Sequence, residues 1–393
     1  MIPRIPLPKD FLAVGYNSGV RRYRPDLGLI LSRRPCAAAG AFTRNSLKAA
    51  PVVYCAAMLP SNSVRAVVVN SGQANAATGS EGAADNLVLV SKTAEALGVL
   101  PNEVLVASTG VIGVRMHLDK LTPALPIAAK GMTDLVNSFA LSIMTTDLVP
   151  KCSHRDVKLS TGKIRLVGAA KGSGMIHPNM GTMLGFIMTD AVVDAAWLDA
   201  AVKEIVDETF NMISVDGETS TNDCVLVLAN GASEAKPDGE KDFELIKKGL
   251  REVMTDLAIS IARDGEGASK LITVKVKGAP NLAIAREASR MITTSPLIKS
   301  AIHGEDPNWG RILARLGQAG VEAQCFEKLR VELQGVRVFD KGKPLAFDRQ
   351  AAREKLHSDQ VLIEIDLGSG SFVATAWGCD LTKRYVEINT EYS

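Results

Sequence analysis

A Gly181–Thr182 dipeptide is the strongest candidate for chemistry, because it lies in a segment, 169–190, that is rich in glycine and hydroxylated residues. A threonine hydroxyl is a poor nucleophile unless a base lies beside it. At a new chain N-terminus, a threonine can use its own α-amine as that base, since such amines titrate at about 7.7–8.0 in model peptides. The Thr182 hydroxyl could create that terminus by attacking the accessible carbonyl of Gly181, and water would then hydrolyse the resulting ester.

The alternative interpretation of this dipeptide is structural. Small residues followed by threonine are common, and the apolar run after Thr182 predicts a buried strand over 183–189. In that case Gly181–Thr182 would only begin the strand. The residues by themselves leave both interpretations open.

Other common catalytic motifs are absent from the sequence. It contains no G-x-x-x-x-G-K-[ST] phosphate loop, no H-E-x-x-H and no G-x-S-x-G. The histidines and cysteines stand far apart, without metal-ligand spacing and without a C-x-x-C pair: His117, His154, His177, His303 and His357; Cys36, Cys55, Cys152, Cys224, Cys325 and Cys379. We therefore expect no metal and no disulfide framework, but buried reduced thiols as in a cytosolic protein.

The composition is that of a globular chain of enzyme size. The 393 residues are 46% hydrophobic and 22% charged, and 45 Lys+Arg against 43 Asp+Glu give a formal net charge of +2. This balance argues against a nucleic-acid binder, which normally has a strongly basic face. The apolar runs are shorter than the roughly 18 residues of a membrane-spanning helix, and the N-terminus lacks a signal-peptide core. We expect a cytoplasmic protein without nucleic-acid or membrane partners.

Strand and helix patterns alternate along the first two thirds of the chain, which predicts an α/β fold. Strands are expected over 65–69, 103–107 and 225–228, and helices over 81–97, 196–212 and 243–262. Gly98 is the expected C-terminal stop of the first helix. In the C-terminal third we expect strands with few helices between them, over 271–276, 329–333, 361–366, 371–377 and 384–388.

A series of segments identifies a family. In order, they are FTRN at 42–45, KAAP at 48–51, NSGQANA at 70–76, STGVIG at 108–113, MTTD at 144–147, AKGSGM at 170–175 with Thr182, DGETSTND at 216–223, DGEG at 264–267, DPNWGR at 306–311, GCDLT at 378–382 and NTEYS at 389–393. Over nearly its whole length the chain resembles the glutamate N-acetyltransferase (ornithine acetyltransferase) family of arginine biosynthesis. Each segment is weak evidence alone, but so many in order are strong evidence.

The resemblance implies a precursor that cuts itself before Thr182. The products would be an α chain, 1–181, and a β chain, 182–393, which stay associated in a heterotetramer of two α and two β chains. The implied fold is a layered α/β sandwich with a smaller subdomain. It is similar to the N-terminal-nucleophile hydrolases but has its own connectivity. Gly181 stands where the family usually has alanine, a departure that could change the cleavage rate.

The resemblance also implies the reaction, a ping-pong acetyl transfer through an acetyl-threonine. Thr182 takes the acetyl group of N2-acetyl-L-ornithine, L-ornithine leaves, and L-glutamate accepts the acetyl group to give N-acetyl-L-glutamate. The oxyanion would be held by the Thr109 hydroxyl and the Gly110 N–H, and the position of this loop after an expected strand suits that role. No cofactor is implied, and acetyl-CoA would be a substrate only in a bifunctional enzyme.

The family's remaining substrate contacts fall on a small set of residues that can be carried over by motif: Thr145, Lys171, Thr182, Glu266, Asn389 and Ser393. Lys171 suits the carboxylates that both substrates carry, and Glu266 suits an ammonium group such as that of the ornithine side chain. Many relatives extend slightly beyond the position of Ser393 to a hydroxyl residue that contacts substrate, which leaves the Ser393 contact open.

Three other functions remain as alternatives. A bifunctional member of the family would also take acetyl from acetyl-CoA. A related self-processing aminopeptidase or amidase would release the acyl group to water. A non-enzymatic binding protein on the same scaffold would have no need for a threonine directly after a glycine.

Overall fold

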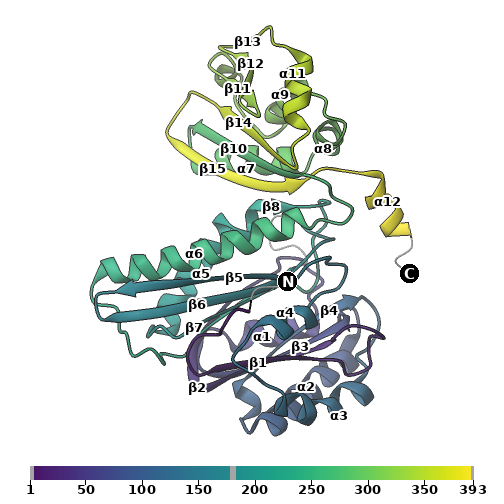
Figure 1. Ribbon diagram of the computed structural model, residues 1–393, viewed down its shortest axis with the longest axis vertical. Coiled ribbons are helices and arrows are strands. Elements are labelled where there is room, and N and C mark those ends of the chain that lie inside the picture. The colour runs from purple at the N-terminus through teal and green to yellow at the C-terminus, as the bar shows by residue number, and fades with distance from the viewer. Residues whose placement is uncertain (1–3, 178–182, 391–393) are drawn as a thin grey trace. The chain divides into compact units, whose positions relative to one another are not determined.

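The computed structural model describes residues 4–177 and 183–390, which form two compact units (Figure 1). The first unit comprises Met1–Gly172, Asn179–Thr209 and Thr219–Leu257. The second comprises Ser173–Pro178, Phe210–Glu218 and Ala258–Ser393. Each unit contains one mixed β-sheet and its own hydrophobic core.

The sheet of the first unit runs in the order β4-β3-β2-β9-β7-β6-β5, with β1 paired to β2. The pairs β3–β4 and β7–β9 are parallel, and the other pairs are antiparallel. The strands are β1 Phe11–Tyr16, β2 Leu27–Phe42, β3 Ser61–Gln73, β4 Val104–Val111, β5 Lys151–Leu159, β6 Gly162–Lys171, β7 Leu184–Thr189 and β9 Cys224–Ala229.

The two central strands of this sheet, β7 and β9, are buried along their whole length. Their sequences, LGFIMT and CVLVLA, are nearly continuous apolar runs, as expected for strands covered on both faces. Phe186 of β7 packs edge-on against Phe139, with 5.2 Å between the ring centroids. The strand expected over 183–189 is confirmed, and it lies at the centre of the sheet.

Helices flank this sheet. They are α1 Ala50–Met58, α2 Gly79–Leu97, α3 Leu118–Lys130, α4 Asn137–Ser142, α5 Ala195–Glu208 and α6 Glu240–Arg263, with a 3-10 turn η1 at Pro101–Glu103. In Figure 1, α2 and α3 lie side by side, and the two helices contact each other. Gly98, in the left-handed conformation at φ 66°, ends α2 as expected.

The sheet of the second unit runs in the order β13-β12-β11-β14-β10-β15-β8. Its strands are β8 Ile213–Ser214, β10 Leu271–Ala279, β11 Arg330–Leu333, β12 Val336–Asp340, β13 Lys343–Pro344, β14 Gln360–Asp366 and β15 Phe372–Cys379. The helices are α7 Leu282–Thr293, α8 Pro296–His303, α9 Trp309–Gln318, α10 Ala323–Phe326, α11 Arg349–Leu356 and α12 Lys383–Thr390, with η2 at Phe210–Met212. Helix α7 packs on β10 and β15.

Two expectations for the C-terminal third are wrong. Helices α7 to α11 lie between the strands, where few helices were expected. The strand expected over 384–388 is instead part of α12. Thr382 explains this difference, because its hydroxyl accepts hydrogen bonds from the N–H groups of Arg384 and Tyr385, the usual contact at a helix N-terminus.

The α/β class with layers of sheet and helix is confirmed. Among the residues that the structure describes, no helix has the length and hydrophobicity needed to cross a bilayer.

Candidate active site

The loop expected to hold an oxyanion is the end of β4, and its shape requires glycine. Gly72 of β3 pairs with Gly110 of β4. Gly110 has φ +131°, and a Cβ placed there would lie 2.2 Å from the carbonyl carbon of Gly72. No side chain fits in that space, so Gly110 brings the two strand ends into close contact. Thr109, one residue earlier, is 3% exposed.

Asn222 fixes this loop from a distant part of the chain. Its Nδ2 donates hydrogen bonds to the carbonyl oxygens of Ser108, at 2.8 Å, and of Ala74. The Ser108 hydroxyl in turn donates to Oδ1 of Asn70. Asn222 is 4% exposed, so these contacts are shielded from water, and the backbone that carries Thr109 is held on both sides.

Gly181 and Thr182 lie outside the residues that the structure describes, but the chain directly after them is well defined. Met183 is 1% exposed. Its N–H donates to Oδ1 of Asp223 at 2.9 Å, and its carbonyl accepts the N–H of Cys224 at 3.3 Å. Met183, the residue that follows Thr182, is therefore held by hydrogen bonds against the start of β9. Asp223 directly follows Asn222, so one short segment contacts both the Thr109 loop and the start of β7.

A buried carboxylate organises two of the expected substrate-binding segments. Oδ1 of Asp147 accepts hydrogen bonds from Nζ of Lys151 at 2.6 Å and from the N–H of Gly172 at 2.7 Å. Its Oδ2 accepts the N–H of Thr145 at 2.9 Å. Asp147 thereby holds the backbone at Thr145 next to the chain that follows Lys171.

The charges around Asp147 are unusual for a protein interior. Burial favours the neutral acid, but the positive charges of Lys151 and Lys171 outweigh this effect and lower the pKa of Asp147 to about 2. Lys171 is 2% exposed at the end of β6 and pairs with Leu184 of β7. The first unit thus holds a buried cation beside the start of β7.

Glu266 and Asn389 meet in the second unit. Nδ2 of Asn389 donates to Oε2 of Glu266 at 3.0 Å, and the Glu266 N–H donates to the carbonyl of Ser173 at 2.9 Å. A Cβ at Gly174 would lie 2.4 Å from the Glu266 carboxyl group. These contacts fix the carboxylate of Glu266. Ser393 lies outside the described residues.

The expected residues thus fall into two groups. Thr109, Gly110, Thr145 and Lys171 lie in the first unit, and Glu266 and Asn389 lie in the second. In the described part of the chain, no group of three or more His, Cys, Asp or Glu could hold a metal ion.

Sequence reasoning gave no role to four buried polar residues of the first unit: Asp147, Lys151, Asn222 and Asp223. Three of them lie within the quoted segments MTTD and DGETSTND. Polar residues in apolar surroundings, such as Asp223 directly before CVLVLA, were the available signal.

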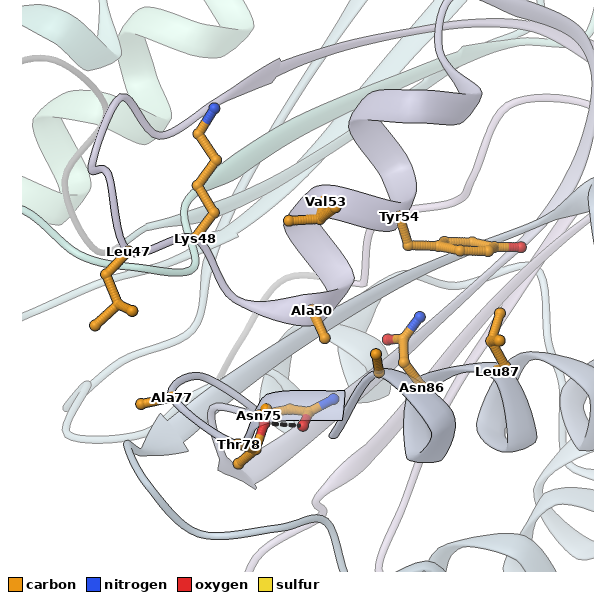
Figure 2. A pocket seen from close by; sticks show the side chains of 12 residues that line it. Leu47, Lys48, Ala50, Val53, Tyr54, Asn75, Ala77, Thr78, Asn86 and Leu87 are labelled. Atoms are coloured by element: carbon orange, nitrogen blue, oxygen red, sulfur yellow. Dashed lines mark hydrogen bonds between the residues drawn. The ribbon is translucent and has the colours of Figure 1, made fainter. Parts of the chain in front are cut away.

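A separate hollow lies between α1 and α2 of the first unit (Figure 2). Its volume is about 490 Å³, and its lining includes Val53, Tyr54 and Leu87. Oδ1 of Asn86 is buried there without a hydrogen-bond partner. None of the expected site residues lines this hollow.

Comparison with known proteins decides the family. The model of the ArgJ family matches residues 12–393. The chain belongs to the ArgJ family. A relative from Symbiobacterium thermophilum, named arginine biosynthesis bifunctional protein ArgJ, is 46% identical in an alignment 394 residues long that covers 98% of this chain and 97% of the relative. The family resemblance deduced from the sequence motifs is confirmed.

Solved structures of ArgJ proteins are also similar. The crystal structure of the Bacillus halodurans bifunctional protein has 41% sequence identity and a TM-score of 0.50, and it covers 51% of this chain and 95% of its own. The Mycobacterium tuberculosis ornithine acetyltransferase complexed with ornithine has 36% identity and a TM-score of 0.38, over 44% of this chain and 92% of its own. The family model and the relative from Symbiobacterium thermophilum confirm the expected enzyme class, an acyltransferase of arginine biosynthesis.

Replacing Lys151 with Met should lower the free energy of unfolding by about 3–5 kcal/mol, because the variant leaves the Asp147 charge buried with one partner fewer. Lys203→Met is the matched control. Lys203 also contacts an aspartate four residues earlier, Asp199, at 2.6 Å, but its side chain is 64% exposed, so the control should lose only about 0–1 kcal/mol.

Urea unfolding at neutral pH measures the free energy of unfolding of both variants. In the wild type, the depressed pKa of Asp147 stabilises the fold fully above its ordinary value of 3.8, and this contribution is lost as the pH falls through about 2. Equal losses in K151M and K203M would contradict the role of Asp147.

Gly110→Ala should reduce acetyl transfer by about 10²–10³-fold, the usual effect of losing one oxyanion donor, because the new Cβ must displace the backbone of Gly72. Gly113→Ala is the control in the same loop. Gly113 also has a positive φ, +82°, but no atom lies within 4 Å of its added Cβ. Steady-state rates and melting curves should show a loss of rate in G110A alone. A similar loss in both variants would mean that the loop only needs glycine for its backbone conformation.

Proposed function

We propose that this ArgJ protein cuts itself between Gly181 and Thr182 and then transfers acetyl groups from N2-acetyl-L-ornithine to L-glutamate. The observation that carries the proposal is the position of Thr182 in the chain. Thr182 immediately precedes Met183, whose backbone is hydrogen-bonded to Asp223 and Cys224 at the start of β9. Asn222, the residue before Asp223, also holds the Thr109–Gly110 loop through the carbonyl of Ser108.

A length difference supports the self-cleavage. The Bacillus halodurans ArgJ chain matches over 95% of its own length but covers only 51% of this chain. That solved chain is therefore about half as long as this one. A family precursor cut near its middle would yield chains of this size. The α chain, 1–181, and the β chain, 182–393, stay associated, two of each, in the cytoplasm.

In the proposed mechanism the Thr182 hydroxyl attacks the acetyl carbonyl of N2-acetyl-L-ornithine, and the α-amine of the same residue takes the hydroxyl proton. The N–H of Gly110 and the hydroxyl of Thr109 stabilise the oxyanion. The α-amine then protonates the departing nitrogen of ornithine. Glutamate enters, and its amine takes the acetyl group from Thr182. The acetyl donor and product are both amides of similar energy, so the transfer needs no ATP and no cofactor.

Charged residues would orient the substrates. Lys171, buried beside the start of β7, binds a substrate carboxylate, which is common to acetylornithine and glutamate. The backbone at Thr145, fixed by Asp147, contributes a further contact. In the second unit, Glu266 binds the side-chain ammonium group of ornithine, with its carboxylate held by Asn389.

A second activity is favoured by the names of the relatives. The similar ArgJ proteins are called bifunctional, which suggests that acetyl-CoA also acylates Thr182. The acetyl-threonine would be the same, so glutamate could be acetylated from either donor.

Intact-mass analysis under denaturing conditions tests the self-cleavage. The wild type should give two species, 1–181 and 182–393, whereas Thr182→Ala should give one uncut chain without acetyl transfer, because it lacks the attacking hydroxyl. Fully active wild-type protein that consists of a single uncut chain would refute the proposal.

Substrate assays with the wild type separate the alternatives. Release of ornithine from N2-acetylornithine should depend on glutamate, since the acetyl group leaves Thr182 for the glutamate amine. Full-rate release without glutamate would instead show an amidase. Product formation from acetyl-CoA and glutamate would establish the second activity.

A further inference from the structure

The hollow between α1 and α2 contains a polar group for which the proposed acetyl transfer has no use. Asn86 of α2 is 2% exposed, and its Oδ1 is buried without a hydrogen-bond partner. Figure 2 shows the amide of Asn86 directed from α2 toward α1, into the hollow. Buried polar atoms normally have a partner, because an unpaired one is costly. An occupant of the hollow with a hydrogen-bond donor would remove this cost.

The other uncharged polar side chains that line the hollow are already paired within the protein. The hydroxyl of Tyr54 donates to a backbone carbonyl of η1 at 3.3 Å. The hydroxyl of Thr78 donates to Oδ1 of Asn75 at 2.8 Å, and Nδ2 of Asn75 donates to the carbonyl of Gly82 at 2.9 Å. The unpaired oxygen of Asn86 is therefore an exception in this lining.

The hollow has a fixed wall, formed by the segment 74–78. The N–H of Ala74 donates to the carbonyl of Val111 at 2.9 Å, and the N–H of Gly113 donates to the carbonyl of Ala76 at 2.9 Å. The space is therefore formed before any ligand binds. Its volume of about 490 Å³ is within the range of small-molecule sites, roughly 300–1,000 Å³.

Apolar side chains surround the amide of Asn86. Val53 of α1 and Leu87 of α2 are both more than half exposed and line the hollow. In Figure 2 the ring of Tyr54 lies across the hollow from Leu87. This lining suits a flat ring with a hydrogen-bonding edge. Adenine is such a ring, because its amino group can donate to the Oδ1 of an asparagine while N7 accepts from Nδ2, and its faces pack on aromatic side chains.

The start of α2 gives the hollow an end that attracts anions. Gly79, the first residue of this helix, lines the hollow. The preceding residue, Thr78, makes no side-chain hydrogen bond to the helix. The N–H groups of a helix N-terminus bind phosphate readily. Of the described residues that line the hollow, only Lys48 carries a charge, and this charge is positive.

Two acidic residues near this end of α2 do not prevent anion binding. Both Glu81 and Asp85 contact the guanidinium group of Arg115, at 3.3 and 2.7 Å. Their negative charges are therefore offset by a cation within the protein.

The spacing of the two ends matches a nucleotide. Asn86 follows Gly79 by seven residues, which is about 10 Å along a helix at about 1.5 Å per residue. An adenosine monophosphate has a comparable length, with adenine and phosphate on opposite sides of the ribose. A purely apolar occupant would leave Oδ1 of Asn86 unpaired, and a free amino acid is too short to reach both ends.

We propose that the hollow binds an adenosine phosphate. Adenine pairs with the amide of Asn86 and packs between Tyr54 and Leu87, and the phosphate lies at the start of α2 beside Lys48. Free adenine nucleotides and coenzyme A both carry this group. The inference does not depend on the proposed acetyl transfer, because binding requires neither self-cleavage nor turnover.

Asn86→Leu removes the amide but nearly keeps the volume of the side chain. The affinity for AMP should fall about tenfold or more, because two hydrogen bonds to adenine are lost. The melting temperature without ligand should not fall, because Oδ1 of Asn86 has no partner to lose. An asparagine that only stabilised the fold would have the opposite effect on the two measurements.

Leu87→Glu and Val88→Glu form a second, matched pair. These neighbours on α2 are 57% and 44% exposed, and of the two only Leu87 lines the hollow. Glutamate is a good helix former, so both variants should fold. L87E places a negative charge beside the bound phosphate and should weaken AMP binding by about tenfold or more, whereas V88E should bind AMP like the wild type.

Isothermal titration calorimetry of the full-length wild type uses AMP, adenosine and coenzyme A as probes. AMP should bind with a dissociation constant below about 1 mM, and adenosine should bind more weakly because it lacks the phosphate. Similar affinities for AMP and coenzyme A would show that the hollow accepts any adenosine phosphate. Binding of coenzyme A that is clearly tighter than that of AMP would identify the coenzyme as the ligand.

Two results would overturn the inference. One is a wild type that binds neither AMP nor coenzyme A. The other is binding that N86L and L87E leave unchanged, since the nucleotide would then lie elsewhere. If N86L does not fold, as judged by its melting curve, the comparison of L87E with V88E decides, and equal affinities in this pair contradict the proposed site.

Discussion

The parallel pairing of β7 with β9 is the constraint on which the rest of the first unit depends. Both strands are buried on both faces, so they must be nearly continuous apolar runs and their polar backbone groups must pair with each other. The pairing fixes the register of Leu184 against Cys224. This register in turn sets Met183 against Asp223, and thereby fixes where the chain emerges after Thr182.

Polar side chains buried around this core hold the loops, which strand pairing does not fix. Asp147 connects Thr145 to the chain after β6, and Asn222 connects the ends of β3 and β4. A buried charge or amide that loses a partner is costly, so each of these groups favours one arrangement of its loops over all others. Loops held in this way are suited to catalysis, because their donors need not reorganise as charge develops on a substrate.

Much of the fold followed from local sequence patterns. Helix α2 with its stop at Gly98, the long α6 and the strand before loop 108–113 were predicted because periodicity and capping are local signals. Helix α12 was missed because β-branched Val386 and Ile388 are typical of a strand, while the capping signal lies before them at Thr382.

The site was less predictable than the fold. The family motifs indicated Thr109, Gly110, Thr145 and Lys171, and the structure places all four in one unit. The roles of Asp147 and Asp223 depend on hydrogen bonds to residues 25 and 40 positions away in the sequence. Such contacts arise from strand register and from chain reversals, and periodicity within one segment carries no information about them.

The order of strands in the first sheet has a consequence for a processed enzyme. Strands β7 and β9 follow the proposed cut, yet they lie between β2 and β6, which precede it. The two products would be interleaved, and separating them would require breaking the ladders on both sides of the β7–β9 pair. Processing would therefore leave the folded sheet intact, but unfolding of the sheet would then also separate the two chains. The melting temperature of the processed protein would therefore depend on protein concentration.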